Sequence, residues 1–375
     1  MIGTLTVHHN ANYGANLQAY ALRACIEKET ENEEVRVIDY RNDLIRNLYA
    51  VRPWNRINEK PYIVINRTSI KRVIKMALNI NGTIVRNLKF AKFRRKYIKT
   101  TKIVYSPKQI KLLNCSSIII GSDQVWNESI TQDKDNVFWG NVKTPNTFVG
   151  SYAPSFGRSS ITDLEKRKLE SNIKNFDYIT VREPSMVNIL SPYTKKKIHV
   201  VCDPIFLLSK KEWFELLDTR VNKSYIFVYI LERNDELLNM ARKISEILRL
   251  KVIILSDGLK LRQSVGKYIK TATPLEFMSL LYSAKFVLTN SFHGTAFSVL
   301  FNKQFITLPD TKKSARMVEF LENCGLEKRI CWRSEDITND LISKPIEYTQ
   351  ANSVLKEMKN SSIQCLQEMI DHNVN

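Results

Sequence analysis

Residues 286–309 read FVLTNSFHGTAFSVLFNKQFITLP, and this stretch decides the fold class. The apolar run at 286–291 predicts a buried strand, the spacing over 292–301 predicts a helix, and residues 305–309 predict a second strand. Two apolar strands joined through a helix form a parallel pair, because the connection returns the chain to the edge of the sheet where it started. The stretch therefore predicts an α/β fold with parallel strands.

The same alternation runs through the rest of the chain. Helical spacing covers residues 16–29 and 235–250. Further strands are predicted at residues 2–7, 35–40, 117–122, 147–153, 178–183, 199–204, 225–231 and 252–256. Repeated strand–loop–helix units are typical of a doubly wound sheet. The number of units fits two Rossmann-like domains better than one.

The border between the two domains falls near residues 208–211, just after the sequence DPIFLL. We expect an N-terminal Rossmann-like domain over residues 1–208 and a C-terminal one over 209–345. A last helix within 346–375 is expected to pack back onto the first domain. Two such domains facing each other would place a ligand cleft between the carboxyl ends of both sheets.

The composition is that of a folded protein with an ample core. Of 375 residues, 43% are hydrophobic and 25% charged, which excludes low-complexity and wholly disordered chains. No run of about 18 uncharged apolar residues could span a bilayer, and the first residues lack a signal-peptide pattern. The six cysteines are scattered without CxxC pairs, which predicts thiols in a reducing cytoplasm. No cluster of Cys and His ligands indicates a metal site, so we expect neither metal nor cofactor.

The net charge of +19 is concentrated in residues 41–102. That segment holds 17 Lys and Arg against two acids, Asp43 and Glu59. Apolar residues recur in it at helical spacing over 70–78 and again over 88–97, which predicts a basic helical segment inserted in the first domain. A basic amphipathic helix suits an anionic membrane surface. The alternative is that its apolar face packs on the protein and its lysines face water.

A nucleic-acid-binding protein is the non-enzyme class that this charge raises. Aromatic residues interleave with the basic ones, but the sequence contains no recognisable nucleic-acid-binding module. We therefore expect no nucleic-acid partner.

The loop TNSFHGT at 289–295 holds the sharpest candidates for chemistry. Ser291 is placed to cap the following helix, so the first-turn N–H groups, with Gly294 and Thr295, would bind a phosphate or carboxylate. Gly294 also lets the backbone come close to a ligand. His293 would stand at this anion site with an imidazole that gains or loses a proton near neutral pH. The alternative is a purely structural histidine.

Two loops of the first domain offer groups suited to a sugar. The turn after the first strand contains Asn12, Tyr13, Gly14 and Asn16, whose alternative role is to shape the turn itself. It matches neither a dinucleotide fingerprint nor a phosphate loop. The adjacent His8 and His9 would point to opposite faces of the strand, and we assign no role to either.

The second loop is GSDQVWN at 121–127. Asp123 and Gln124 can hydrogen-bond a polyhydroxylated ligand, and Trp126 can stack on a sugar face. The alternative is a capping aspartate and a core tryptophan. Ser155 follows the next strand and would contribute a hydroxyl to the same edge.

Three cations follow strands and would complete an anion site. Arg182 offers a planar fork for a carboxylate or phosphate, or alternatively forms an ion pair with Glu183 or another acid. Lys313 and Arg316 follow the last strand and add positive charge beside the His293 loop. Solvation at the surface is the alternative for these two.

Six segments, taken in order, resemble the motif series of the polysaccharide pyruvyl transferase family. They read NANYGANLQAYAL, IIIGSDQVWN, SYAPSFG, VREPS, VCDPIFLL and TNSFHGTAFSVLFNKQFITLP. The resemblance covers about residues 2–325, and the combination of GSDQVWN with SFHGT is its most specific part. It implies a GT-B-like fold of two facing Rossmann-like domains. One departure stands out: some members carry Arg two residues before the histidine, where this chain has Ser291.

The resemblance implies transfer of pyruvate from phosphoenolpyruvate to a sugar of a bacterial surface polysaccharide, giving a pyruvate ketal. His293 would then be the acid–base group, and Asp123 would accept a proton from the sugar hydroxyl. Donor binding would fall to Arg182, Lys313 and Arg316 together with the helix start at 291–295, because Ser291 replaces the family's arginine.

The acceptor implied by the resemblance is a sugar, often linked to a lipid diphosphate at the cytoplasmic face of the membrane. The first-domain loops would hold it, and the basic segment 41–102 gives a physical reason to place the chain there as a peripheral protein. The alternative within enzymes is a GT-B glycosyltransferase that uses a nucleotide sugar in the same pathway.

Overall fold

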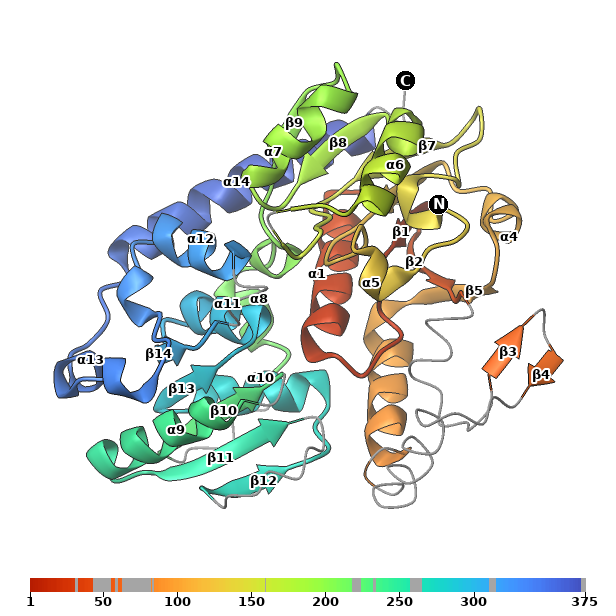
Figure 1. The fold of residues 1–375 in the computed structure, drawn as a ribbon. Helices are drawn as coiled ribbons and strands as arrows, with labels where there is room; N and C mark the ends of the chain where they lie inside the picture. The colour runs from red at the N-terminus through yellow and green to blue at the C-terminus, as the bar shows by residue number, and fades with distance from the viewer. Residues whose placement is uncertain are drawn as a thin grey trace. The chain divides into compact units, whose positions relative to one another are not determined.

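The computed structural model describes residues 1–30, 33–42, 55–57, 60–62, 82, 84–158, 160–217, 224–231, 234–256, 265–309 and 315–371 (Figure 1). The chain divides into two compact units. Unit 1 comprises Met1–Leu207 and Met358–Asn375, and unit 2 comprises Leu208–Glu357. A search of the described helices for a stretch that could cross a lipid bilayer finds none.

Unit 1 is built on a seven-stranded sheet in the order β5-β2-β1-β6-β7-β8-β9, in which every neighbouring pair is parallel. Its strands are β1 (Ile2–Leu5), β2 (Val35–Tyr40), β5 (Thr100–Val104), β6 (Ser117–Ile120), β7 (Phe148–Ser151), β8 (Tyr178–Val181) and β9 (Ile198–Val200). The four residues of β1 and of β6 are all buried, as expected for central strands covered on both faces.

The helices of unit 1 begin at capping residues that the sequence supplies. They are α1 (Tyr13–Glu29), α4 (Pro107–Lys111), α5 (Glu128–Thr131), α6 (Asp163–Asn172) and α7 (Ser185–Leu190), with short turns η2 (Val137–Trp139), η3 (Ile173–Asn175), η4 (Ser191–Tyr193) and η5 (Pro204–Phe206). The Asn12 side chain accepts a hydrogen bond from the Ala15 N–H, so α1 begins before the predicted residue 16. Thr162 and Glu165 form a capping box at α6.

Unit 2 has a second parallel sheet, in the order β12-β11-β10-β13-β14. Its strands are β10 (Tyr225–Ile230), β11 (Lys251–Ser256), β12 (Lys267–Ile269), β13 (Phe286–Thr289) and β14 (Gln304–Thr307). The connection from β13 through α11 (Phe292–Leu300) to β14 is the strand–helix–strand unit predicted from residues 286–309. Two parallel sheets in two units confirm the predicted α/β class with Rossmann-like architecture.

The remaining helices of unit 2 follow the same pattern. They are α8 (Lys210–Phe214), α9 (Asp235–Leu248), α10 (Pro274–Ser283), α12 (Ala315–Asn323) and α13 (Asn339–Ser343), with turns η6 (Glu327–Arg329) and η7 (Ser334–Asp336). The α9 helix buries Leu237, Leu238, Ala241 and Ile244, whose spacing places them on one face of a helix.

The last helix, α14 (Thr349–Asp371), begins in unit 2, and its residues from Met358 onward belong to unit 1. Inside unit 1 it is tied to the edge of the sheet: Tyr178 donates a hydrogen bond to Glu368 at 2.5 Å, and the Cys202 N–H donates to the Ser362 hydroxyl at 2.8 Å. In Figure 1 this helix is drawn in blue beside β8 and β9.

The basic segment is described only in part. Its first predicted helix, around residues 70–78, lies outside the described residues. Residues 55–57 and 60–62 form the antiparallel pair β3 (Asn55–Ile57) and β4 (Lys60–Tyr62), which the sequence did not predict. Residues 84–93 are helical and continue into the π-helix η1 (Arg94–Ile98), which confirms the second basic helix.

Candidate functional site

The start of α11 in unit 2 carries the sequence's main candidates. Ser291 is the N-cap residue, and its hydroxyl accepts a hydrogen bond from the Gly294 N–H at 3.5 Å. The strand before it ends at Thr289, two residues earlier than predicted, because the Thr289 hydroxyl donates to the Tyr229 carbonyl and accepts from the Ser291 N–H. This local network fixes a helix N-terminus at the carboxyl end of β13, as the motif predicts.

His293 is the second residue of α11, and 5% of its surface is exposed. Its ring lies edge-on to that of Phe292, with centroids 5.4 Å apart. The guanidinium of Arg316, from α12, lies over the ring of Phe292, 4.7 Å from the ring centroid. The structure therefore brings Arg316 to the start of α11. Lys313 lies outside the described residues.

Gly294 and Thr295 have internal roles that the sequence did not reveal. A Cβ at position 294 would lie 2.5 Å from the Thr289 hydroxyl oxygen, so the absent side chain admits that threonine. Thr295 is fully buried, and its hydroxyl lies 2.8 Å from that of Thr307 on β14. The expectation that Gly294 serves a ligand's approach is corrected here, because the group it accommodates belongs to the protein.

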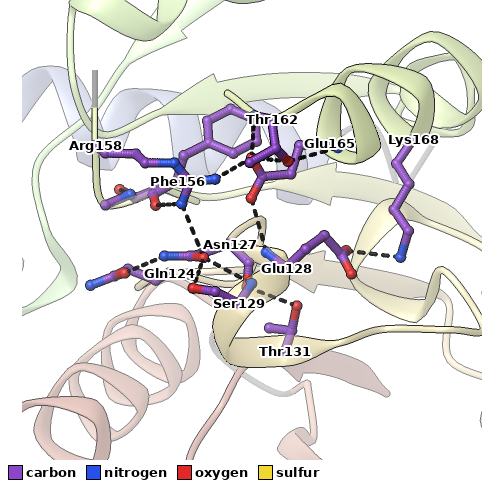
Figure 2. Close-up of polar contacts among 12 residues, drawn as sticks. Gln124, Asn127, Glu128, Ser129, Thr131, Phe156, Arg158, Thr162, Glu165 and Lys168 are labelled. Carbon is purple, nitrogen blue, oxygen red and sulfur yellow. Dashed lines mark hydrogen bonds and ion pairs between the residues drawn. The ribbon is translucent and has the colours of Figure 1, made fainter. Parts of the chain in front are cut away.

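In unit 1 the loop GSDQVWN follows β6 and is held by side-chain hydrogen bonds (Figure 2). Asp123 has a φ of 68°, in the left-handed region that asparagine and aspartate tolerate. Its carbonyl accepts hydrogen bonds from the N–H groups of Val125 and Ser155. The amide oxygen of Gln124 accepts from the Asn127 amide at 2.8 Å. Asp123 and Gln124 are each half-buried, so both remain accessible at this edge.

A series of hydrogen bonds and one ion pair connects Gln124 to Glu165 of α6 (Figure 2). Arg158 donates to the Asn127 side-chain oxygen at 3.1 Å and also pairs with Glu165. Glu165 is fully buried and accepts a further hydrogen bond from the Glu128 N–H at 3.0 Å. A buried carboxylate therefore fixes, through one arginine and one asparagine, the orientation of the Gln124 amide.

Trp126 does not face a ligand. Its ring is fully buried and stacked on Trp139, with centroids 5.1 Å apart and planes 7° apart, and its N–H donates to the Phe138 carbonyl. The predicted stacking of Trp126 on a sugar is wrong, because both polar and aromatic parts of the side chain are used inside the unit 1 core. This is the core-tryptophan alternative.

Arg182 is enclosed by carboxylates at the ends of β8 and β9. Its guanidinium pairs with Glu183 at 3.0 Å and with Asp203 at 2.8 Å, and it is 7% exposed. Burial acts to lower the arginine's pKa, but Glu183, Asp203 and Asp123 outweigh it, so the pKa lies above its ordinary value. The ion-pair alternative thus holds, and the expectation that Arg182 grips the donor is corrected.

Ser155 belongs to the same buried network. Its hydroxyl donates to Glu183 at 2.9 Å and accepts from the Gly157 N–H at 2.8 Å, and the residue is fully buried. The predicted contact of Ser155 with an acceptor is therefore wrong. The hydroxyl instead orients a carboxylate that holds Arg182.

The turn before α1 is likewise occupied with its own structure. The Asn16 amide donates to the carbonyls of Asn10 and Asn12, and Asn16 is fully buried. Tyr13 is 1% exposed and packs on Phe90 at 5.1 Å between ring centroids. Gly14 is buried as well. The acceptor roles predicted for Tyr13, Gly14 and Asn16 are corrected for this reason, while Asn12 is half-buried and caps α1.

His8 and His9 do not point to opposite faces. Because β1 ends at Leu5, the chain at His8 is no longer an extended strand, and the two rings lie 3.9 Å apart. Together with Asp39 of β2 they bring three potential ligand atoms within 4.8 Å of one another. The sequence did not predict this group, because Asp39 is distant in the chain from the two histidines.

Two residues of these networks escaped the sequence reading. Glu165 and Asp203 are buried acids that pair with arginines from other segments of the chain. Glu165 could have been found from the pattern T-x-x-E at 162–165, which signals a capping box. Nothing local marks Asp203 as the partner of Arg182, because 21 residues separate them. All six cysteines are free thiols, as predicted, and all six are buried.

Comparison with known proteins decides the family. The profile of the polysaccharide pyruvyl transferases matches residues 12–310, which includes both GSDQVWN and SFHGT. The chain belongs to the polysaccharide pyruvyl transferase family. It is therefore a transferase of polysaccharide biosynthesis. No curated protein matches the sequence significantly.

Solved structures of similar fold identify the fold type of this chain. A UDP-N-acetylglucosamine 2-epimerase is similar with a TM-score of 0.55 and 12% identity, covering 99% of this chain and 95% of that one. The epimerase from Rickettsia bellii gives a TM-score of 0.53 at 10% identity, covering 100% and 95%. At these identities the likeness concerns the fold alone. It confirms a GT-B-type α/β fold for this pyruvyl transferase family member.

Proposed function

We propose that this chain transfers the enolpyruvyl group of phosphoenolpyruvate to two hydroxyls of a sugar and forms a pyruvate ketal. The observation that carries the proposal is the family match over residues 12–310, which spans the helix start bearing His293 as well as the Asp123 loop. The sugar would belong to a bacterial surface polysaccharide or to its lipid-linked precursor.

The proposed reaction places specific demands on the protein. A proton adds to C3 of the enol, and positive charge develops at C2. One sugar hydroxyl forms an O–C2 bond, the C2–O bond to phosphate breaks, and a second hydroxyl forms another O–C2 bond. Of the two hydroxyl protons, one balances the proton gained at C3 and the other leaves on phosphate. The site must therefore bind a trianion and move protons.

The start of α11 supports binding of the donor. A helix of nine residues with its N-cap at Ser291 presents first-turn N–H groups to an anion. Arg316 supplies a positive charge over the ring of Phe292, the residue before His293. We assign to His293 the delivery of the proton to C3. Lys313 remains a proposed further cation.

Asp123 and Gln124 are our candidates for the acceptor side. Both are half-buried, and the Gln124 carbonyl oxygen is already taken by Asn127, which leaves its two N–H donors oriented for a sugar hydroxyl. We assign to Asp123 the acceptance of a hydroxyl proton.

The test is a coupled assay on the intact chain. The protein is incubated with phosphoenolpyruvate and candidate sugars, and release of inorganic phosphate and the ketal methyl signal are measured together. Release of phosphate with ketal formation supports the proposal. Transfer of a sugar from a nucleotide sugar, with no consumption of phosphoenolpyruvate, would instead establish a glycosyltransferase.

We also propose that the helix at 84–98 brings the protein to an anionic membrane at the cytoplasmic face. Phe90, Phe93 and Ile98 pack inside unit 1, which is the packing alternative for that face. On the outside, Leu88 is 65% exposed, and Ile84 and Val85 are exposed beside it. Exposed cations follow on the same segment at Lys92, Arg95 and Lys96. Exposed apolar residues next to cations are the pattern of an interfacial helix.

Sedimentation with lipid vesicles tests the membrane proposal. We expect binding to phosphatidylglycerol vesicles and not to phosphatidylcholine vesicles, with weaker binding as salt rises. Leu88→Ser should reduce binding, whereas Leu112→Ser, at a leucine 68% exposed in the same unit, should not. Equal sedimentation with both lipids at low salt would contradict the proposal.

A further inference from the structure

A polar cluster lies where β1 and β2 end, apart from the groups assigned above. His9 Nε2 is 3.3 Å from Asp39 Oδ1, and the His8 and His9 rings lie 3.9 Å apart. Arg41 donates two hydrogen bonds to Asp39, one to each carboxylate oxygen, both at 2.8 Å. Arg94, the first residue of η1, is close enough to interact electrostatically with all four. Groups from three chain segments thus interact electrostatically here.

The charges in this cluster disfavour a metal cation. Both oxygens of Asp39 are already engaged by Arg41. His9 Nε2 lies 2.8 Å from the Tyr40 carbonyl, which only accepts, so this nitrogen carries a proton and has no lone pair to offer. Burial keeps both histidines neutral by lowering their pKa values, that of His8 to about 4. Among the described groups, two guanidinium ions face one carboxylate, which leaves the cluster net positive.

Arg94 has a buried N–H donor for which the described residues supply no hydrogen-bond acceptor. Its Nη1 is buried, and no described residue accepts a hydrogen bond from it. Burial and the nearby Arg41 lower the pKa of Arg94 to about 10, so the group stays charged at neutral pH. A buried N–H donor of a charged group is costly when no acceptor replaces the water that it lost. An anion would supply both the charge and the acceptor oxygens.

His8 presents a second unused atom in the same cluster. Its Nδ1 lies 3.0 Å from the Thr6 carbonyl and is therefore the protonated nitrogen. Its Nε2 is buried without a partner among the described residues, and the side chain is fully buried. The neutral ring thus offers one lone pair, which can accept a hydrogen bond from a P–OH group.

We propose that Arg94, Arg41 and His8 form a binding site for a phosphoryl oxyanion at the carboxyl ends of β1 and β2. Arg94 would donate to its oxygens, and His8 Nε2 would accept from a protonated one. The Arg41 side chain is 37% exposed, so the cluster is open to solvent on that side. The ligand is either free phosphate or a phosphate monoester of a larger molecule, because both can carry, near neutral pH, the P–OH group from which His8 would accept. This site is independent of the proposed function of α11.

Arg95 provides a matched control for Arg94. It is the next residue of η1, carries the same charge, and is exposed. We compare thermal unfolding and calorimetric titration with inorganic phosphate for the intact protein, Arg94→Gln and Arg95→Gln. We expect phosphate to raise the unfolding temperature of the wild type and of Arg95→Gln. In Arg94→Gln, phosphate affinity should fall roughly 10- to 100-fold, as for a lost charge-assisted hydrogen bond.

Without phosphate, Arg94→Gln should unfold at the same or a higher temperature, because it removes a charged group whose buried Nη1 has no acceptor among the described residues. That result also shows that loss of binding is not loss of folding. Glucose 1-phosphate separates the two sources: binding at least as strong as that of phosphate indicates a phosphate monoester, and binding of phosphate alone indicates the free ion. Wild-type affinity in Arg94→Gln, equal loss in Arg95→Gln, or Zn²⁺ binding that depends on His8 and Asp39 would each overturn the proposal.

Discussion

The carboxyl edges of the two sheets are made of different chemistry. In unit 1, arginines form ion pairs with carboxylates: Arg182 pairs with Glu183 and Asp203, and Arg158 pairs with Glu165. In unit 2, the hydrogen bonds described at the start of α11 join hydroxyl, amide and carbonyl groups, for example Thr289 to Tyr229. Both edges belong to parallel α/β sheets. Ion pairs neutralise the charged side chains at the edge in unit 1, whereas the hydrogen bonds at the helix start in unit 2 join neutral groups.

This difference separates scaffold from binding surface. An arginine that is buried between acids stabilises the contact between strands. Because the acids neutralise its charge, it attracts an anionic ligand only weakly. Where a helix begins among neutral groups, the partial positive charge of its N–H groups is not cancelled. The comparison predicts that substitution of the buried arginine–acid pairs of unit 1 acts mainly on stability and that substitution of His293 at the start of α11 acts mainly on turnover.

The largest effect is expected for His293→Ala. If His293 delivers the proton to C3, kcat should fall about 10²- to 10⁴-fold. The unfolding temperature should change little, because the side chain makes its ring contact at the start of the helix rather than in the hydrophobic core of unit 2. Phosphate release and thermal unfolding are measured side by side. Near-normal turnover would remove His293 from the mechanism.

Arg182→Met should act on stability instead. It leaves Glu183 and Asp203 buried without their cation, which should lower the free energy of unfolding by about 3–5 kcal/mol. The control is Arg333→Met, whose side chain is 72% exposed and 3.6 Å from Asp336, and which should cost less than about 1 kcal/mol. Urea denaturation measures both. A stable Arg182 variant with weakened donor binding would restore the role that the sequence suggested.

A pH dependence should appear in unit 1 through Asp133. Burial raises the pKa of this carboxyl to about 6, and its Oδ1 has no described hydrogen-bond partner. The folded state therefore binds the proton more tightly than the unfolded chain. The resulting stability is fully present below about pH 4 and is lost as pH rises through about 6.

Asp133→Asn keeps the acceptor for the Phe138 N–H but does not titrate. Relative to this variant, the wild type should lose roughly 2–3 kcal/mol of unfolding free energy between pH 4 and pH 7. Chemical denaturation of both proteins across that range measures the difference. Parallel pH profiles would show that Asp133 keeps an ordinary pKa.

The smallest effect is expected for Gly294→Ala in unit 2. The new methyl group would press on Thr289, whose hydroxyl is already fixed by two hydrogen bonds, and should cost about 1–3 kcal/mol. Adding Thr289→Ala should cost less than the sum of the two single changes. Gly82→Ala, where nothing lies within 4 Å, is the control. Strict additivity would show that the two side chains do not interact.

Much of the fold was predictable because each strand and helix carries its own signal. The run FVLT and the cap at Ser291 are local patterns, and both elements formed where expected. Strand ends were placed too late, because polar residues such as Asn290 were included in the predicted strand but begin the loop in the structure. The short strands β5 and β12 were missed, since exposed edge strands such as Thr100–Val104 lack a continuous apolar pattern.

The candidate site was predictable only where it is local. The SFHGT helix start is set by neighbours within five residues, and the structure reproduces it. Trp126 and Ser155 were misassigned because their partners, Trp139 and Glu183, come from other segments. A polar or aromatic residue at a strand end reads the same in sequence whether it faces a ligand or the core.

The sequence by itself determined the α/β class, the parallel strand–helix units, the family motifs and the concentration of positive charge. These depend on periodicity and capping, which act over a few residues. Only the tertiary structure decided which charges are neutralised: that Arg182 is enclosed by two acids, that Glu165 orients Asn127 through Arg158, and that Asp39 is paired with Arg41 beside His9. The reason is physical, since the energy of a charge depends on its burial and its partners, and both are set by residues distant in the chain.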